Sequence, residues 1–196
     1  MSTVTVVRKN GRIAIAADTL TKWGGGKESA DYIVNHRKII QVGDSLLGIT
    51  GTATAHLILT DYFAGLETPP AFATPAEIFR AWNALHGALK ENYFLQAQED
   101  KEDELESSRM DVLIANRRGI FGVSAHRTVQ EFSRFYAYGS GSSYALGAMF
   151  VAYAEPERDA GEVARLGVLA ACEFHDESGP PVELHVLEER VLEEGS

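Results

Sequence analysis

The chain opens with two runs of β-branched and apolar residues on either side of a short turn signal. Residues 2–7 are mostly β-branched, and residues 12–18 are rich in isoleucine and alanine. Between them stand Asn10 and Gly11, a pair typical of a tight hairpin turn. The pattern predicts a β-hairpin. Both strands carry apolar residues on both faces, which indicates a sheet that is covered on both sides.

Beyond the hairpin, runs of strands alternate with pairs of helices. Residues 23–27 are rich in glycine but lack the ending of a phosphate-binding loop, so they predict a flexible hairpin tip. Residues 74–77 hold a capping threonine, a proline at the first helical position and a glutamate, the start signal of a helix. The other predicted elements are strands at 38–42, 45–51, 110–115, 119–124, 129–132, 135–138 and 182–186, and helices at 52–66, 75–93, 143–154 and 161–173.

This order of elements predicts an α+β fold. Runs of strands separated by helical pairs favour an αββα four-layer sandwich, in which two antiparallel sheets are flanked by helical pairs. Neither a repeat nor a linker interrupts the sequence, so we expect a single domain over residues 1–196. The acidic segment 98–106 is interpreted as a solvated loop or a frayed helix end, and it lacks the spacing of a calcium loop.

Composition narrows the classes of partner. The net charge of −10 disfavours nucleic acid and anionic membrane, which require clustered Lys and Arg. Cys172 is the one cysteine, so no intrachain disulfide forms, as is common in a reducing compartment. The sequence shows neither a signal peptide nor an apolar stretch long enough to cross a bilayer. We therefore expect a cytoplasmic protein.

The start of the chain offers a nucleophile with a base of its own. Ser2 follows Met1, and a small second residue is the usual condition for removal of the initiator. A terminal serine then presents a hydroxyl that attacks and a free α-amine, with a pKa of about 7.7–8.0, that accepts the proton. Many chains begin with Met-Ser and have no such role, so further residues must support this interpretation.

Three residues are candidates for that support. Hairpin pairing places Asp18 near Ser2 and Thr3, because residues equidistant from the turn lie side by side. Lys38 opens a further predicted strand, and its charge would lower the pKa of the Ser2 amine. The backbone N–H of Gly48 is a candidate oxyanion donor. Each has an ordinary alternative: Asp18 as a turn residue at the end of a strand, and Lys38 as a surface charge.

Taken together, these segments resemble the proteasome β-subunit/HslV family. Residues 2–18 are similar to its N-terminal nucleophile, turn and aspartate, with the family's spacing from Ser2 to Asp18. Residues 35–39 resemble its lysine segment, 47–53 its glycine turn and 138–145 its Gly-Ser-Gly segment. The match runs in order through most of the chain. Within the family, the chain most resembles the bacterial single-subunit branch, including the proteasome homologues of β-proteobacteria.

The resemblance implies an N-terminal-nucleophile hydrolase fold and specific roles. Ser2 would be the nucleophile, Asp18 and Lys38 would tune and orient it, and Gly48 would donate to the oxyanion. Ser140, in the Gly-Ser-Gly segment, would form hydrogen bonds near the nucleophile. The chemistry requires no organic cofactor or metal, although family members often bind a structural cation.

The sequence departs from the family in several places. The nucleophile is serine rather than threonine, and Thr3 becomes the alternative if two residues are trimmed. The stretch before Lys38 is longer than in HslV, which makes Arg37 a second candidate for the lysine position. The family's Asp-x-x-Ser motif is altered here, where Asp176 and Ser178 have a different spacing. Residues 97–107 also form a longer connection than is usual.

The implied activity is hydrolysis of polypeptide substrates inside stacked rings of identical subunits, and an ATPase unfoldase partner cannot be identified from the residues. Two alternatives stay open. One is a ring-forming scaffold subunit without turnover. The other is an amidase that acts on small molecules, because hydrolases of this chemistry share it across substrates.

Overall fold

A computed structural model describes residues 2–98 and 104–190 of the chain. Within this part the helices are α1 (Ala53–Ala64), α2 (Pro75–Glu91), α3 (Ser142–Tyr153) and α4 (Ala160–Phe174). The strands are β1 (Thr3–Lys9), β2 (Arg12–Ala17), β3 (Thr21–Trp23), β4 (Gly26–Glu28), β5 (Ile39–Val42), β6 (Ser45–Ile49), β7 (Val112–Asn116), β8 (Gly119–Val123), β9 (Val129–Phe132), β10 (Phe135–Gly139) and β11 (Glu183–Glu188). No helix of the described residues is long and apolar enough to cross a membrane.

The strands form two larger antiparallel sheets and a small hairpin. One sheet has the order β10-β1-β2-β11, and the other has the order β5-β6-β7-β8-β9. The predicted hairpin at Asn10 and Gly11 pairs β1 with β2, and both turn residues have the positive φ that this turn demands. The glycine-rich tip joins β3 to β4, as the sequence predicts.

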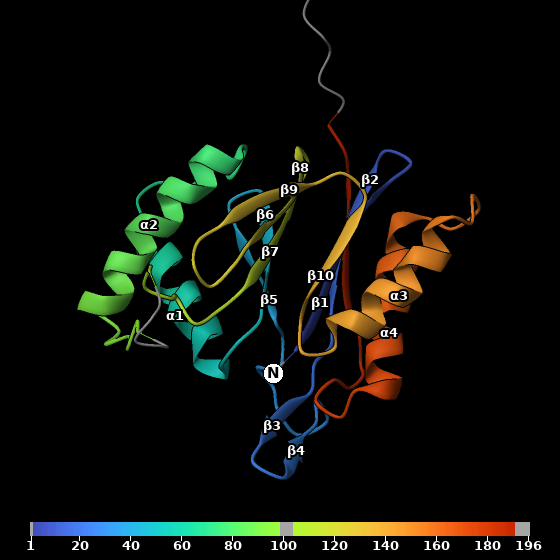
Figure 1. The fold of residues 1–196 in the computed structure, drawn as a ribbon, viewed down its shortest axis with the longest axis horizontal. Coiled ribbons are helices and arrows are strands. Elements are labelled where there is room, and N and C mark those ends of the chain that lie inside the picture. The colour runs from blue at the N-terminus through green and yellow to red at the C-terminus, as the bar shows by residue number, and fades with distance from the viewer. Residues whose placement is uncertain (1, 99–103, 191–196) are drawn as a thin grey trace, which may run out of the picture.

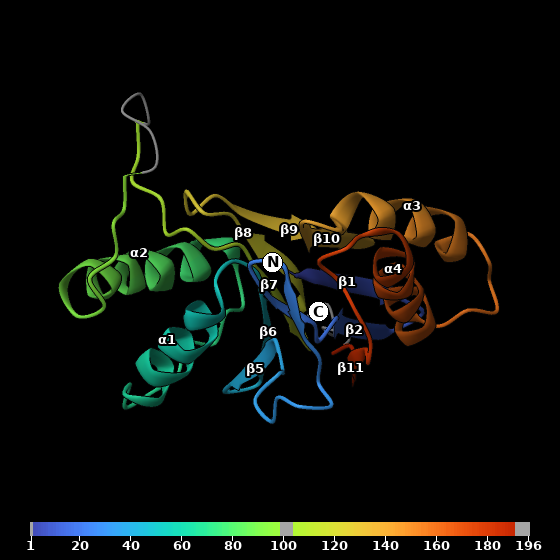
Figure 2. The same ribbon diagram turned by 90° about the horizontal axis from the view of Figure 1, so that it is seen from below.

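The four layers follow from the two-sided burial of the strands. Figures 1 and 2 show α1 and α2 beside the five-stranded sheet, and α3 and α4 beside the four-stranded sheet. Between the sheets lies an apolar layer that includes Val4, Val6, Ile13, Ile15 and Leu113. The predicted αββα sandwich is confirmed.

Local capping explains two of the helix starts. The Thr74 side chain accepts a hydrogen bond from the Glu77 N–H, and Pro75 occupies the first turn of α2, as predicted. In α4, Asp159 and Glu162 form a reciprocal capping box, so the helix begins at Ala160, one residue before the predicted start.

Two differences from the predicted elements lie close to the eventual site. The strand predicted over 45–51 ends at Ile49, because Gly51 has a φ of +116° and turns the chain away from the sheet. In the acidic segment 98–106, residues 99–103 lie outside the described part. Glu106, at its end, is held by Lys90 and His86 of α2 and is therefore not a freely solvated charge.

Gly48 shows how closely the two sheets approach. It lies inside β6, and a Cβ built there would stand 2.3 Å from Cγ1 of buried Val4 on the facing sheet. We expect Gly48→Ala to lower the free energy of unfolding by about 1–3 kcal/mol, because the core has no room for the methyl group. Urea denaturation measures the change.

The matched control is Gly87→Ala in α2, where an added Cβ meets nothing within 4 Å. Alanine there removes a helical glycine, which should stabilise the protein by roughly 0.5–1 kcal/mol. Equal unfolding midpoints for the two variants would contradict the packing role of Gly48.

Candidate active site

The hairpin brings the start of the chain to Asp18. The Thr3 N–H donates to Oδ1 of Asp18 over 2.8 Å, and the Asp18 N–H donates to the Thr3 carbonyl oxygen over 3.1 Å. Both residues are fully buried, and Ser2, one residue earlier, is 5% exposed. Asp18 therefore lies beside the first residues of the chain, where hairpin pairing predicts it.

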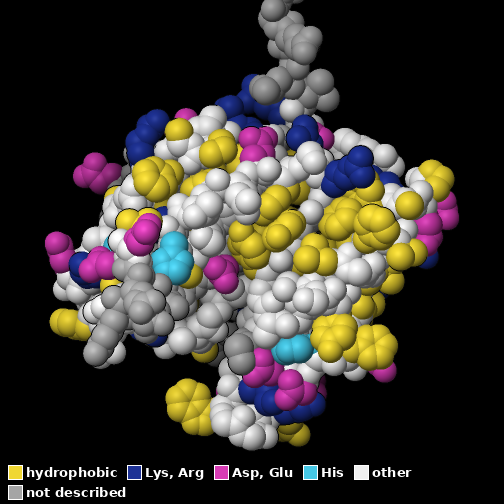
Figure 3. Space-filling view, viewed as in Figure 1, with side chains coloured by type: hydrophobic (Ala, Val, Ile, Leu, Met, Phe, Trp, Pro, Cys, Tyr) yellow, Lys and Arg dark blue, Asp and Glu magenta, His cyan; other side chains and the backbone are white. Residues whose placement is uncertain are grey.

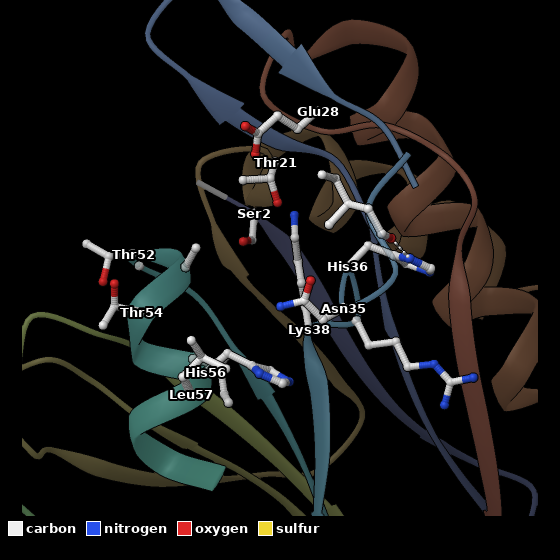
Figure 4. A pocket seen from close by; sticks show the side chains of 15 residues that line it. Ser2, Thr21, Glu28, Asn35, His36, Lys38, Thr52, Thr54, His56 and Leu57 are labelled. Carbon is white, nitrogen blue, oxygen red and sulfur yellow. Dashed lines mark hydrogen bonds between the residues drawn. The ribbon is translucent and has the colours of Figure 1, made fainter. Parts of the chain in front are cut away.

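Lys38 completes a buried ion pair. It stands just before β5, and its Nζ donates to Oδ1 of Asp18 over 2.8 Å and to the Leu20 carbonyl oxygen over 2.6 Å. Burial lowers the pKa of Lys38 below its ordinary value, and the charge of Asp18 opposes this shift. Figure 4 shows the Lys38 side chain pointing toward Ser2.

The turn after α4 contributes further hydrogen bonds to the buried group around Asp18. Oδ2 of Asp18 accepts hydrogen bonds from the N–H groups of Leu20 and Gly179, both over 3.1 Å. The hydroxyls of Thr3 and Ser178 lie 2.7 Å apart, within hydrogen-bonding distance. Ser178, which the sequence offered only with altered spacing, is thus part of the buried group around Asp18.

The structure separates Asp176 from this group. Its carboxylate is exposed and pairs with Nζ of Lys22 over 2.7 Å. Together with His175 and Glu177 it places possible ligand atoms within 4.8 Å of one another. Since exposed acidic groups commonly gather without an ion, and Lys22 already neutralises Asp176, we assign no metal to these residues.

Two alternatives from the sequence are placed less favourably than the first choices. Thr3 is fully buried inside the paired part of β1, and its hydroxyl is engaged by Ser178. Arg37 is exposed and lines a cavity, but the contact to Asp18 is made by Lys38. The geometry favours Ser2 over Thr3, and Lys38 over Arg37.

Ser2 lies where two of the cavities formed by the described residues meet. A cavity of about 330 Å³ extends toward α1 and the segment before β5 and is called the α1-side cavity below. A second cavity of about 860 Å³ extends past the ends of β7 and β10 to the start of α3. Gly51, Thr52 and Ala53 line both cavities together with Ser2. Ser140 is exposed and lines the second.

Solved structures supply the decisive comparison. BPH of Thiobacillus denitrificans in complex with epoxomicin is 70% identical over 96% of this chain and 100% of that chain, with a TM-score of 0.92. BPH of the same organism is 71% identical over 96% of this chain and 98% of that chain, again with a TM-score of 0.92. The chain belongs to the proteasome/HslV-like family.

A more distant proteasome/HslV-like structure agrees in fold. Eukaryotic HslV from Trypanosoma brucei is 19% identical over 95% of this chain and 99% of that chain, with a TM-score of 0.70. The sequence matches no protein-family model and no curated protein. The predicted family is confirmed by the BPH structures.

Within this proteasome/HslV-like site, the structure places Gly48, the expected oxyanion donor, away from the cavities beside Ser2. Gly48 lies in the middle of β6, paired with Ile39 on one side and Leu113 on the other, and it lines neither of the cavities beside Ser2. Gly51, three residues later, lines both. Its N–H lies beyond the end of β6 and outside the strand ladder. Gly48 has the packing role described above, and Gly51 is the glycine that lines both cavities.

Gly139, a position that the sequence analysis did not identify, lies against Ser2. It has a φ of +99°, and a Cβ built there would stand 1.9 Å from the Ser2 carbonyl oxygen. Any side chain at this position would displace the backbone of Ser2. The Gly-Ser-Gly segment of the sequence contains both this glycine and Ser140.

The buried Asp18–Lys38 pair yields a stability prediction. Asp18→Asn leaves the Lys38 ammonium buried without an opposite charge, so we expect the free energy of unfolding to fall by about 3–5 kcal/mol. Urea denaturation again provides the measurement. Asp176→Asn is the control, because it removes a carboxylate from an exposed pair with Lys22 and should change stability little. Similar losses of stability in both variants would show that the buried pair contributes no more to folding than the exposed pair of Asp176 and Lys22.

Proposed function

We propose that this protein is a peptide-bond hydrolase whose nucleophile is Ser2 after removal of Met1. The observation that carries the proposal is the position of Ser2, at the junction of two cavities and beside the buried pair of Asp18 and Lys38. A structure 70% identical to this chain is a complex with epoxomicin, which supports a ligand-binding site in this chain as well.

The chemistry proceeds in two steps. The Ser2 hydroxyl oxygen attacks the carbonyl carbon of the peptide bond, and its proton passes to the free α-amine of Ser2. The C–N bond then breaks, and the departing amine takes up that proton. Water hydrolyses the remaining ester and restores the hydroxyl. Lys38, held by Asp18, places a positive charge next to the hydroxyl and favours the ionised oxygen.

The start of α1 is suited to hold the oxyanion. The side chain of its N-cap residue, Thr52, makes no capping hydrogen bond, so the first N–H groups of the helix are not capped by it. The helix dipole adds partial positive charge at this end. The Gly51 N–H, immediately before this turn, is the donor that we assign in place of Gly48.

An extended polypeptide fits this arrangement better than a small amide. Ser2 is flanked by cavities of about 330 Å³ and about 860 Å³, one for each side of a cleaved bond. A small amide would fill only part of one of them. This favours the peptidase over the amidase alternative.

Assembly into rings of identical subunits is supported by an unpartnered apolar surface. Figure 3 shows apolar side chains gathered over β9, β10 and α3. Phe150 and Val151 of α3 are 74% and 65% exposed, and they line a groove of about 780 Å³ with Phe132 and Phe135. A helix that is apolar all round, as α3 is, is normally buried. A second copy of the chain would cover it.

Covalent labelling tests the nucleophile. Intact mass spectrometry should find the chain without Met1, and incubation with a peptide epoxyketone should add the mass of one reagent to each subunit. Ser2→Ala should abolish the added mass. Retention of Met1, or equal labelling of Ser2→Ala, would exclude the proposed nucleophile.

Peptide turnover tests Lys38. Lys38→Ala should lower the rate of peptide cleavage by about 10²–10⁴-fold, because the hydroxyl loses its neighbouring charge. Size-exclusion chromatography should show the same assembly as the parent protein. Lys27→Ala, on the exposed strand β4, is the control and should retain the parent rate. An unchanged rate in Lys38→Ala would reject its role, and a parent protein that assembles without labelling or turnover would favour the scaffold alternative.

A further inference from the structure

The α1-side cavity has walls of mixed character. Apolar side chains of Ile33, Ile49 and Leu57 line it together with the polar ends of Asn35 and His56. Figure 4 shows Asn35 and His56 reaching into the same part of the cavity, Asn35 from the segment before β5 and His56 from α1. A cavity that selected purely apolar side chains would not need these two polar groups.

His56 is the most informative of these residues. Its Nε2 is buried and has no hydrogen-bond partner among the described residues. Burial lowers the pKa of His56, so the imidazole is neutral at neutral pH. A buried polar atom without a partner costs free energy, which is recovered when a ligand supplies the missing hydrogen bond. The residue as a whole is only half-buried and lines the cavity.

The other histidine of this wall is already engaged. Nδ1–H of His36 donates to the Ile33 carbonyl oxygen over 2.6 Å, and Figure 4 shows its ring turned away from Ser2. Lys38 is likewise bound to Asp18 and Leu20. Asn35 and His56 are therefore the groups suited to meet the tip of an entering side chain.

The charges around the cavity favour neither a positively nor a negatively charged side chain in the ligand. Glu28 of β4 and Arg37 line it, and Lys38 is neutralised by Asp18. Glu183 of β11 contributes a further negative charge that acts on His56. An entering carboxylate would face Glu28, and an entering ammonium would face Arg37. A side chain with an uncharged tip avoids both repulsions.

We infer that the α1-side cavity accepts an uncharged side chain that ends in a hydrogen-bonding group, such as glutamine or tyrosine, and that His56 and Asn35 recognise that group. This inference rests on the proposed function and specifies its substrate class. The apolar walls contact the stem of the side chain, and an amide or phenol can both donate to and accept from the two residues.

Matched peptides provide the test. Fluorogenic substrates that differ only in one residue next to the cleaved bond should be compared as Gln against Met and as Tyr against Phe, because each pair differs mainly in the polar tip. We expect kcat/KM to be about tenfold or more higher for Gln than for Met, and for Tyr than for Phe. His56→Leu should reduce both ratios to near one, and His56→Gln should restore part of them.

The control variant is His126→Leu, which changes an exposed histidine in the turn between β8 and β9 and should keep both ratios. Thermal unfolding of each variant shows that the fold is retained. Ratios near one in the parent protein, or ratios that survive in His56→Leu, would overturn the inference.

A binding measurement separates this inference from the proposed function. Fluorescence anisotropy of labelled, uncleaved peptides with the Ser2→Ala protein reports recognition without turnover. A preference for Gln over Met in binding supports the cavity assignment even if the parent protein neither labels nor cleaves. Equal binding, in a preparation whose parent protein labels at Ser2, refutes the cavity assignment and leaves the hydrolase proposal intact.

Discussion

The carboxylate of Asp18 is the point at which separate parts of the chain are joined. Within the described residues its two oxygens accept hydrogen bonds from Thr3 at the start of β1, Leu20 after β2, Lys38 before β5 and Gly179 after α4. These hydrogen bonds fix both oxygens of the carboxylate in place. Asp18 therefore holds Lys38 beside the first residues of the chain.

The fold was predictable because local signals agree with one another. The Asn-Gly turn sets the register of β1 and β2, so Asp18 lies beside Thr3 without any information from the rest of the chain. The caps of α2 and the two-sided apolar runs likewise point to helices on both outer faces. Each of these features depends on residues close together in sequence, which a pattern can reveal.

The parts of the site that the sequence left open or did not identify depend on contacts between distant segments. Gly48 and Gly51 stand in the same short stretch, and only the facing Val4 on the other sheet shows that Gly48 is required for packing. Ser178 reaches Thr3 across 175 positions of sequence, which no local spacing rule covers. No motif in the sequence singles out His56, and only the assembled cavity shows that its Nε2 has no partner among the described residues.

Gly139 has a consequence for how variation in this chain would be tolerated. A methyl group at that position would meet the Ser2 carbonyl oxygen at 1.9 Å, so the loop that begins α3 and the first residue of the proposed mature chain form one steric unit. Substitution there would displace the backbone of Ser2 and would leave every ionisable side chain in place. A search for important positions that considers only polar or charged residues would therefore miss this glycine.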